Sequence, residues 1–204
     1  MTVRGRALYV ALEGIDGAGK STVQRRVAAL LRRGGRRVRT RREPSDPVLG
    51  RYAQSAAATS PWTGAVFFTI DRFLARPGLC RDLRECDVVL SDRSFWSTIA
   101  YQGSALSPAD RRRLLALQRD ATVAPDLVIW LDIPVSVALS RLTRRPGSPA
   151  PLERARILRR VASAYRSLSR RAHWRRIEAR GPVGVIAEQV ARAIVRARAA
   201  TPRR

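Results

Sequence analysis

The segment Gly14-Ile15-Asp16-Gly17-Ala18-Gly19-Lys20-Ser21 fits the pattern G-x-x-x-x-G-K-[ST], which places a glycine-rich turn between a strand and a helix. The flanking residues supply that context. Before the segment, the apolar run Ala7–Leu12 predicts a buried strand, because residues on both of its faces are apolar. After Lys20, apolar residues recur at helical spacing until Gly34-Gly35, which predicts the end of a helix. The sequence therefore predicts a strand, a phosphate-binding loop and a helix, in that order.

The chemistry of this loop is that of a nucleotide phosphate site. Glycines let backbone N–H groups converge on phosphate oxygens, and the helix N-terminus adds the positive end of its dipole. The ammonium of Lys20 would neutralise the β- and γ-phosphates, and the hydroxyl of Ser21 would bind Mg²⁺. We therefore expect ATP and Mg²⁺ as cofactors. The residues expected to bind ATP are Gly14, Ile15, Asp16, Gly17, Ala18, Gly19, Lys20, Ser21 and Thr22.

A glycine-rich turn that merely happens to contain a lysine is the competing interpretation. The chain has a single lysine, Lys20, beside 39 arginines. In this composition, a chance match of that lysine to two glycines at the required offsets and to a following Ser or Thr has a probability of roughly 5 in 10,000. Nucleotide binding is therefore favoured. Phosphoryl transfer does not yet follow, because GTPases and ATP-driven motors use the same loop.

Along the rest of the chain, predicted strands alternate with predicted helices. Short apolar runs predict further strands at residues 38–42, 87–92, 126–132 and 176–179. Helical spacing predicts helices at 62–74, 135–144 and 152–169, and a last helix through the apolar positions 185, 186, 190, 194 and 195. We expect an α/β fold, a P-loop NTPase-type three-layer sandwich with a doubly wound, mostly five-stranded parallel sheet.

Domain length and loop composition complete the predicted organisation. At 204 residues the chain is long enough for one three-layer domain, so we expect a single kinase-type domain over residues 1–204. Between the helices predicted at 135–144 and 152–169, prolines and a glycine interrupt the chain, and this segment, about 145–152, predicts a short lid.

The net charge of +24 and the isoelectric point near 11.8 would ordinarily suggest a nucleic-acid partner. Here the arginines are scattered through nearly every predicted helix, which argues against a dedicated nucleic-acid surface. A basic nucleic-acid-binding P-loop module stays open as the alternative from another class. No segment approaches the about 20 apolar residues of a membrane span, so we expect no membrane partner and a cytoplasmic location.

The few cysteines and the single histidine argue against a zinc site and against a catalytic triad. Cys80 and Cys86 fit a reducing compartment and lack the partner ligands that a zinc site would need. His173 is the only histidine, so hydrolysis by a serine–histidine–aspartate triad has almost no residues to draw on.

Several short motifs beyond the loop occur in a specific order. Glu13 precedes the loop, and an Arg-Glu-Pro element occupies 42–44. Residues 67–72 read Phe-Phe-Thr-Ile-Asp-Arg, and Asp92-Arg93 is followed by Ala-Tyr-Gln-Gly at 100–103. Pro-Asp-Leu at 125–127 and Leu-Asp-Ile-Pro at 131–134 complete the series. Over nearly its whole length the chain resembles the thymidylate kinase (dTMP kinase) family of P-loop nucleoside monophosphate kinases.

The resemblance implies phosphoryl transfer from Mg-ATP to a pyrimidine deoxynucleoside monophosphate, with dTMP to dTDP as the expected reaction of dTTP biosynthesis, and a homodimer. Asp16 would contact the sugar 3′-hydroxyl, Phe68 would stack on the base, and Arg72 would hydrogen-bond the base edge or the neighbourhood of its phosphate. Arg93 would hold the phosphates that exchange the γ-group, and Tyr101 would close over the deoxyribose. The residues expected in catalysis are Lys20, Asp16 and Arg93. The residues expected at the substrate are Arg42, Glu43, Phe68, Arg72, Arg93 and Tyr101.

A physical argument stands beside the resemblance, and so do simpler interpretations. Transfer spreads negative charge over phosphoryl oxygens, so it requires fixed cations and Mg²⁺. Phe68 could instead be core, and Arg72 could be a surface arginine. Asp92 ends a predicted buried strand, where open α/β sheets place ligands. We expect Ser21 and Asp92 to serve Mg²⁺, with Asp92 either orienting a Mg²⁺-bound water or anchoring Arg93.

Three positions depart from the family pattern. Gly17 stands where some members carry an arginine for ATP, and the duty would then pass to an arginine in or near the lid: Arg141, Arg144, Arg145, Arg154 or Arg156. Ser45-Asp46-Pro47 replaces two glycines and a threonine, and Ser94 replaces an aromatic residue or histidine. An aspartate at 46 would oppose an acceptor phosphate. A deoxynucleoside kinase or another nucleotide kinase of this fold therefore stays open.

Overall fold

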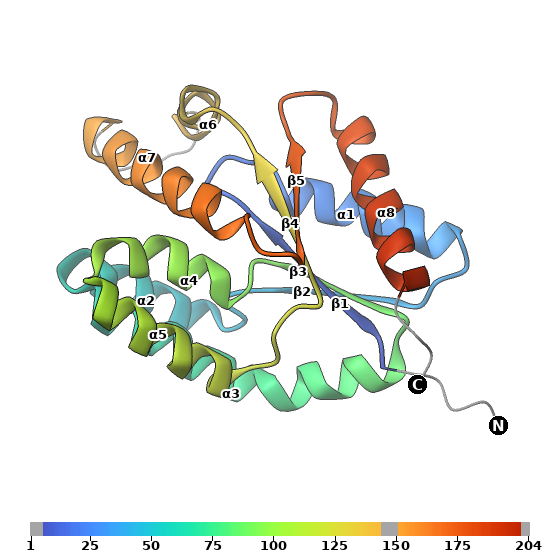
Figure 1. The fold of residues 1–204 in the computed structure, drawn as a ribbon, viewed down its shortest axis with the longest axis horizontal. Coiled ribbons are helices and arrows are strands. Elements are labelled where there is room, and N and C mark those ends of the chain that lie inside the picture. Colours follow the sequence, from blue (N-terminus) through green and yellow to red (C-terminus); the bar gives the residue numbers. More distant parts are fainter. Residues whose placement is uncertain (1–5, 144–150, 201–204) are drawn as a thin grey trace.

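The computed structural model describes residues 6–143 and 151–200, which form a parallel sheet between two layers of helices (Figure 1). All four strand pairings are parallel, and the spatial order is β2-β3-β1-β4-β5. The predicted α/β class and the five-stranded parallel sheet are confirmed. The strands are β1 (Leu8–Glu13), β2 (Val38–Arg42), β3 (Val88–Asp92), β4 (Leu127–Asp132) and β5 (Trp174–Glu178).

Helices cover both faces of this sheet. On one face α1 packs against α8, and on the other lie α3, α4, α5 and α7, with α2 packed on α3 (Figure 1). The helices are α1 (Lys20–Arg33), α2 (Pro47–Thr59), α3 (Pro61–Glu85), α4 (Phe95–Tyr101), α5 (Pro108–Ala121), α6 (Val135–Leu142), α7 (Pro151–Leu168) and α8 (Val183–Ala200). A single 3₁₀ turn, Gly103–Ala105, follows α4.

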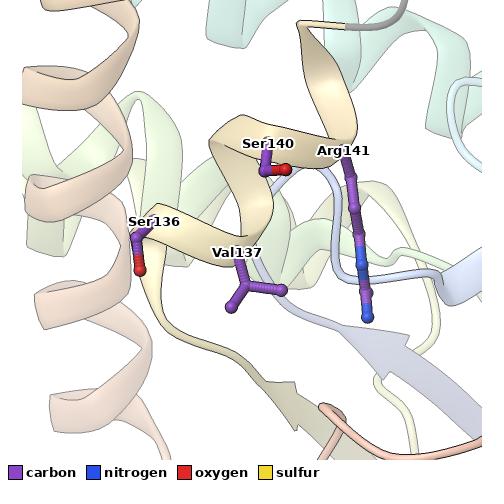
Figure 2. Close-up of a pocket in the computed structure, with 4 residues that line it drawn as sticks. All are labelled: Ser136, Val137, Ser140 and Arg141. Atoms are coloured by element: carbon purple, nitrogen blue, oxygen red, sulfur yellow. The ribbon is translucent and has the colours of Figure 1, made fainter.

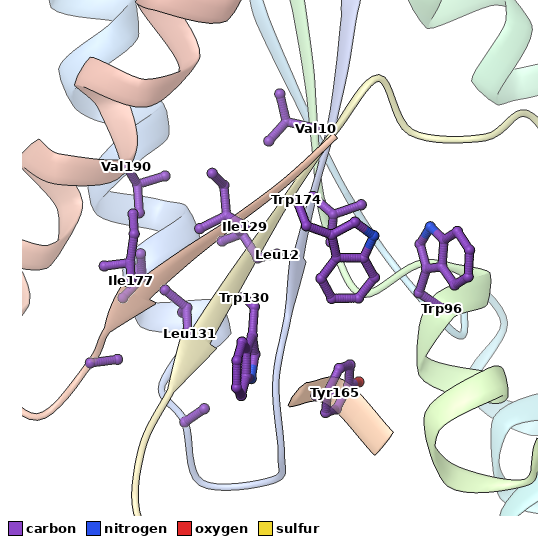
Figure 3. Packing of buried hydrophobic residues seen from close by; sticks show 14 of the residues in the cluster. Val10, Leu12, Trp96, Ile129, Trp130, Leu131, Tyr165, Trp174, Ile177 and Val190 are labelled. Atoms are coloured by element: carbon purple, nitrogen blue, oxygen red, sulfur yellow. The ribbon is translucent and has the colours of Figure 1, made fainter. Parts of the chain in front are cut away.

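The three central strands are apolar on both faces because both faces are covered. Every residue of β1 and β3 is buried, as are five of the six residues of β4. Figure 3 shows Ile129 on the side of α8 with Val190, whereas Trp96, Tyr165 and Trp174 form an aromatic group on the side of α4 and α7. The rings of Trp96 and Trp174 meet edge to face, with centroids 5.6 Å apart. This packing holds α4 and α7 against the sheet.

The structure corrects several predicted elements. Helices α2, α4 and α5 were not predicted, and β5 begins two residues before the expected 176–179. Helix α3 extends to Glu85 instead of residue 74 and contains Pro77, because buried Leu79 and Leu83 continue its packing against the sheet. In α8 the side chains of Val185 and Val195 are exposed, although the other predicted apolar positions are buried. Most of the predicted lid segment lies outside the described residues.

Candidate functional site

The glycine-rich loop lies at the carboxyl end of β1 and leads directly into α1. Two of its glycines occupy positions that no other residue would fit. Gly14 has φ +143°, and a Cβ there would lie 2.6 Å from the carbonyl oxygen of Leu131. Gly17 has φ +85°, and its Cβ would lie 2.7 Å from the carbonyl oxygen of Ala138 in α6. The loop is therefore held between β4 and α6 by contacts that only glycine permits.

Lys20, the first residue of α1, is buried inside the loop. Its Nζ donates to the carbonyl oxygens of Gly14 and Ile15, each at 3.0 Å. Burial lowers the pKa of Lys20 to about 8, and the charge of Arg93 adds to that effect. A desolvated ammonium with a depressed pKa gains from a nearby anion, so the loop is suited to a phosphate group.

Ser21 and Asp92 meet beside Lys20, because β1 and β3 are neighbouring parallel strands with Leu12 opposite Asp92. The Ser21 hydroxyl donates to Oδ2 of Asp92 at 2.5 Å. Oδ1 of Asp92 is buried and has no hydrogen-bond partner among the described residues. A hydroxyl and a free carboxylate oxygen are suitable ligands for Mg²⁺, which takes few protein ligands and completes its shell with water and phosphate. These residues thus fit the expected cation.

Arg93 follows β3 and contacts two other predicted site residues. Its backbone φ is +77°, a conformation that side-chain-bearing residues seldom adopt. Its guanidinium donates to Asp16 and to the Ser97 hydroxyl, and it lies 5.3 Å from the ring centroid of Tyr101. The Asp16 backbone N–H in turn donates to the Tyr101 hydroxyl at 2.9 Å. The structure therefore brings Asp16, Arg93 and Tyr101 together.

Two cavities adjoin at this cluster. The loop cavity, of about 750 Å³, runs along the glycine-rich loop past Arg42 and Asp92 to the segment between β5 and α8. The side cavity, of about 400 Å³, is bounded by α2, α3, α4 and α7 and includes Phe68 and Tyr101. The residues that line both cavities are Asp16, Glu43, Pro44, Gln54 and Arg93. A group bound in one cavity can thus reach a group bound in the other.

Arg72 is buried and held on several sides, so it is not a surface arginine. Its Nε donates to Glu43 at 2.8 Å, its Nη1 to Gln118 at 2.7 Å and its Nη2 to the Ser94 carbonyl oxygen at 3.4 Å. Burial raises the pKa of Glu43, and the charge of Arg72 opposes that rise. Three of the five guanidinium N–H groups are used by described protein atoms, which leaves two for a molecule in the side cavity.

Both departures from the family pattern after β2 and β3 have local structural roles. The Asp46 carboxylate caps α2 by accepting from the backbone N–H groups of Val48 and Leu49, and it lines neither cavity. The Asp46 carboxylate thus has a structural role as a helix cap, and its repulsion of an acceptor phosphate stays a prediction. Ser94 donates through its backbone N–H and its hydroxyl to Glu13, each at 2.8 Å, and it caps α4.

Of the arginines expected to replace a loop arginine, Arg141 reaches the loop. Its Nη1 donates to the carbonyl oxygen of Gly17 at 3.1 Å. Figure 2 shows the side chain running from α6 toward the blue N-terminal segment. Ser136, Val137, Ser140 and Arg141 line a surface hollow of about 570 Å³ on the same helix. Arg156 is exposed, and the positions or side chains of Arg144, Arg145 and Arg154 lie outside the described residues.

Sequence reasoning missed several residues that line the two cavities. Most of them come from helices that the sequence did not predict or from segments distant along the chain. Arg25 instead lies on the predicted helix α1, where nothing in the sequence separates it from the other arginines of that helix. The missed residues are Gln54, Thr98, Gln102, Ile157 and Arg160 in the side cavity, and Arg25, Ala179, Gly181, Val183 and Ile186 in the loop cavity.

Within residues 6–143 and 151–200, no helix is both long and apolar enough to cross a membrane.

Comparisons with known proteins identify the family of this chain. Residues 12–190 match the family model for thymidylate kinase. A probable thymidylate kinase of Methanopyrus kandleri is 41% identical over 163 residues, which cover 80% of this chain and 74% of that protein. A probable thymidylate kinase of Archaeoglobus fulgidus is 34% identical over 160 residues, covering 78% and 80% of the two chains. The thymidylate kinase of Xanthomonas euvesicatoria pv. vesicatoria is 35% identical over 170 residues, covering 79% and 72%. The chain belongs to the thymidylate kinase family of phosphotransferases.

Proposed function

We propose that this chain transfers the γ-phosphoryl group of Mg-ATP to dTMP and releases ADP and dTDP. The observation that carries the proposal is the junction of the two cavities at Asp16 and Arg93. One cavity contains a phosphate-binding loop and the other an aromatic side chain beside a buried arginine. That arrangement fits a donor nucleotide and an acceptor nucleotide whose phosphates meet at Arg93.

The donor ATP would occupy the loop cavity. Its phosphates would accept hydrogen bonds from the loop backbone and from Lys20, and its base would lie at the far end of the cavity against Ala179, Val183 and Ile186. Arg141, held over Gly17, would add a cation on the α6 side. Ser21 and Asp92 would hold Mg²⁺, which supplies a Lewis acid for the phosphate oxygens.

The acceptor dTMP would occupy the side cavity. Phe68 would stack on the thymine, and Arg72 would donate to its 4-oxo group through an N–H that the protein leaves unused. Asp16 would accept from the 3′-hydroxyl, and Tyr101 would close over the sugar. Arg93, which lines both cavities, and Arg42, which lines the loop cavity, would neutralise the 5′-phosphate. Glu43 would orient Arg72 through the hydrogen bond that it accepts from Nε.

Transfer then needs no covalent intermediate on the protein. An oxygen of the dTMP phosphate attacks the γ-phosphorus of ATP, and ADP leaves. Negative charge spreads over the oxygens in transit, where Lys20 and Arg93 are already fixed by contacts to Gly14, Asp16 and Ser97. Fixed cations lower the barrier because they need no reorganisation during the reaction.

The direct test is formation of dTDP from ATP and dTMP, measured by chromatography for the wild-type chain and for Lys20→Ala. We expect the variant to lose at least about 100-fold in kcat while its thermal unfolding stays cooperative, because Lys20 faces the transferring charge. Duplex DNA binding at physiological salt is measured in parallel. Unchanged dTDP formation in Lys20→Ala, together with tight duplex binding, would favour the nucleic-acid module instead.

We also propose that residues 1–204 form one kinase domain, that the protein works in the cytoplasm, where its nucleotide substrates are found, and that it is a homodimer. Helix α3 exposes four apolar side chains at helical spacing, Val66, Ile70, Phe73 and Leu74, and Leu74 is 70% exposed. A second copy also carries a charge of +24. Two such copies associate only where apolar contact outweighs their repulsion, and the exposed apolar side chains of α3 support this face as the proposed contact.

A further inference from the structure

Glu13, the last residue of β1, is a fully buried carboxylate that accepts four hydrogen bonds. Its Oε1 accepts from the backbone N–H and the hydroxyl of Ser94, each at 2.8 Å. Its Oε2 accepts from the Ser97 hydroxyl at 2.6 Å and from the Tyr165 hydroxyl at 2.8 Å. A buried carboxylate requires such donors, because they replace the water lost on folding. Glu13 therefore joins the end of β1 to α4, which carries Ser97, and to α7, which carries Tyr165.

The same hydrogen bonds extend to Arg93. The Ser97 hydroxyl gives its only proton to Glu13 and accepts from Nη1 of Arg93 at 2.9 Å. The Tyr165 hydroxyl lies 3.1 Å from the Ser97 hydroxyl and gives its own proton to the same Glu13 oxygen. A continuous series therefore runs from Tyr165 through Glu13 and Ser97 to the guanidinium of Arg93.

We infer that Tyr165 is a positioning residue for phosphoryl transfer, acting on Arg93 through Glu13 and Ser97. The inference rests on the role proposed for Arg93 above. Tyr165 lines neither cavity, and its ring is fully buried among the aromatic side chains of the core (Figure 3). It cannot touch a nucleotide, so any effect of its hydroxyl on turnover has to pass through other residues.

The position of Arg93 depends on the hydrogen bonds around it. Its φ of +77° is costly for a residue with a side chain, so the observed position depends on the contacts around it. Asp16, the contact on its other side, is half-exposed. The buried support comes from Ser97, whose hydroxyl is oriented by Glu13. Loss of the Tyr165 hydroxyl removes one of the four donors of Glu13, so Glu13 holds Ser97 less firmly and Arg93 can shift. A small displacement of Arg93, which stabilises the transferring charge, lowers the rate of transfer.

The test begins with Tyr165→Phe, which keeps the ring and removes only the hydroxyl. We expect kcat for dTDP formation to fall about fivefold to tenfold, with little change in the KM for ATP, because Lys20 and the glycine-rich loop keep their own contacts. Val161→Ala is the matched control, since Val161 is also fully buried on α7 but has no side-chain group that could donate a hydrogen bond to Glu13. It should lower the unfolding temperature without changing kcat. Ser97→Ala should reproduce the loss, and Ser97→Thr, which keeps a hydroxyl, should restore most of it.

The decisive comparison repeats Tyr165→Phe in an Arg93→Ala background. If Tyr165 acts through Arg93, the second substitution should cause no further loss of kcat. Equal losses in both backgrounds, or no loss of kcat in either, would overturn the inference, as would a kcat for Val161→Ala as low as that of Tyr165→Phe. If Arg93→Ala alone leaves kcat unchanged, the role proposed for Arg93 fails instead. Should Tyr165→Phe not fold, Ser97→Ala takes its place in the same comparison.

Discussion

The protonation of the Lys20 amine can be measured near neutral pH. In the structure its pKa is about 8, lowered first by burial and then by Arg93. Below pH 8 the side chain is therefore charged, and above pH 8 it becomes neutral before any nucleotide is bound. A phosphate anion beside the amine favours the charged form and raises the pKa again, so binding above pH 8 takes up a proton.

We predict that the Kd for ATP rises as pH increases above 8, by up to about tenfold per pH unit, and that binding takes up close to one proton there. Calorimetry in two buffers with different ionisation enthalpies measures both quantities. Lys20→Ala is the control and should bind ATP weakly without this proton uptake. A wild-type affinity that stays constant between pH 7.5 and 9.5 would show that the Lys20 amine does not titrate in that interval.

Residues near the loop could be predicted from the sequence because their positions follow from local order. Lys20 and Ser21 lie inside one motif, and Asp92 ends a buried strand that pairs with the strand before that motif. Gln118 and Tyr165 could not be predicted in this way. Each approaches its partner from a helix distant along the chain, and the hydrogen bonds of Gln118 to Arg72 and of Tyr165 to Glu13 exist only after the helices pack on the sheet.

At the scale of elements, the sequence predicted those whose signal is apolar periodicity and missed those whose signal is a cap. Helix α5 carries three consecutive arginines, Arg111, Arg112 and Arg113, so its apolar side is short. What marks its start is Ser107 followed by Pro108, and α2 starts in the same way with Asp46 and Pro47. A cap residue followed by proline therefore predicts the starts of both helices and gives Asp46 a role as a cap.

The role of Asp46 can be decided by Asp46→Ala. Loss of the cap of α2 should lower the free energy of unfolding by about 1 kcal/mol, measured by chemical denaturation. The KM for dTMP should not decrease, because Asp46 lines neither cavity. Asp46→Ser, which keeps a capping oxygen and removes the charge, separates the two effects and should retain most of the stability. A severalfold lower KM for dTMP in both variants would show that the Asp46 carboxylate repels the acceptor phosphate.

For the whole molecule, the distribution of charge determines how copies can meet. With a net charge of +24, most faces of two copies repel one another, and the apolar side of α3 is the proposed contact. We predict a dimer by light scattering, and a monomer after Leu74→Glu, because Leu74 is the most exposed large apolar side chain of that helix. Val195→Glu on α8, which also places an acid at an exposed apolar position, is the control and should stay dimeric. A wild-type chain that is monomeric at all concentrations would contradict the proposed homodimer.

The choice of acceptor is the sharpest test of the proposed function, because phosphoryl transfer depends on both cavities at once. We would supply Mg-ATP with dTMP, dUMP, dCMP or thymidine and measure the phosphorylated product of each by chromatography. We predict that dTMP is the best acceptor and that dCMP is at least about tenfold poorer in kcat/KM. The 4-amino group of cytosine would face the N–H donors of Arg72, which leaves donors on both sides without an acceptor. The preference for dTMP over dCMP should be lost in Arg72→Ala. Phosphorylation of thymidine without any dTDP formed from dTMP would contradict the account.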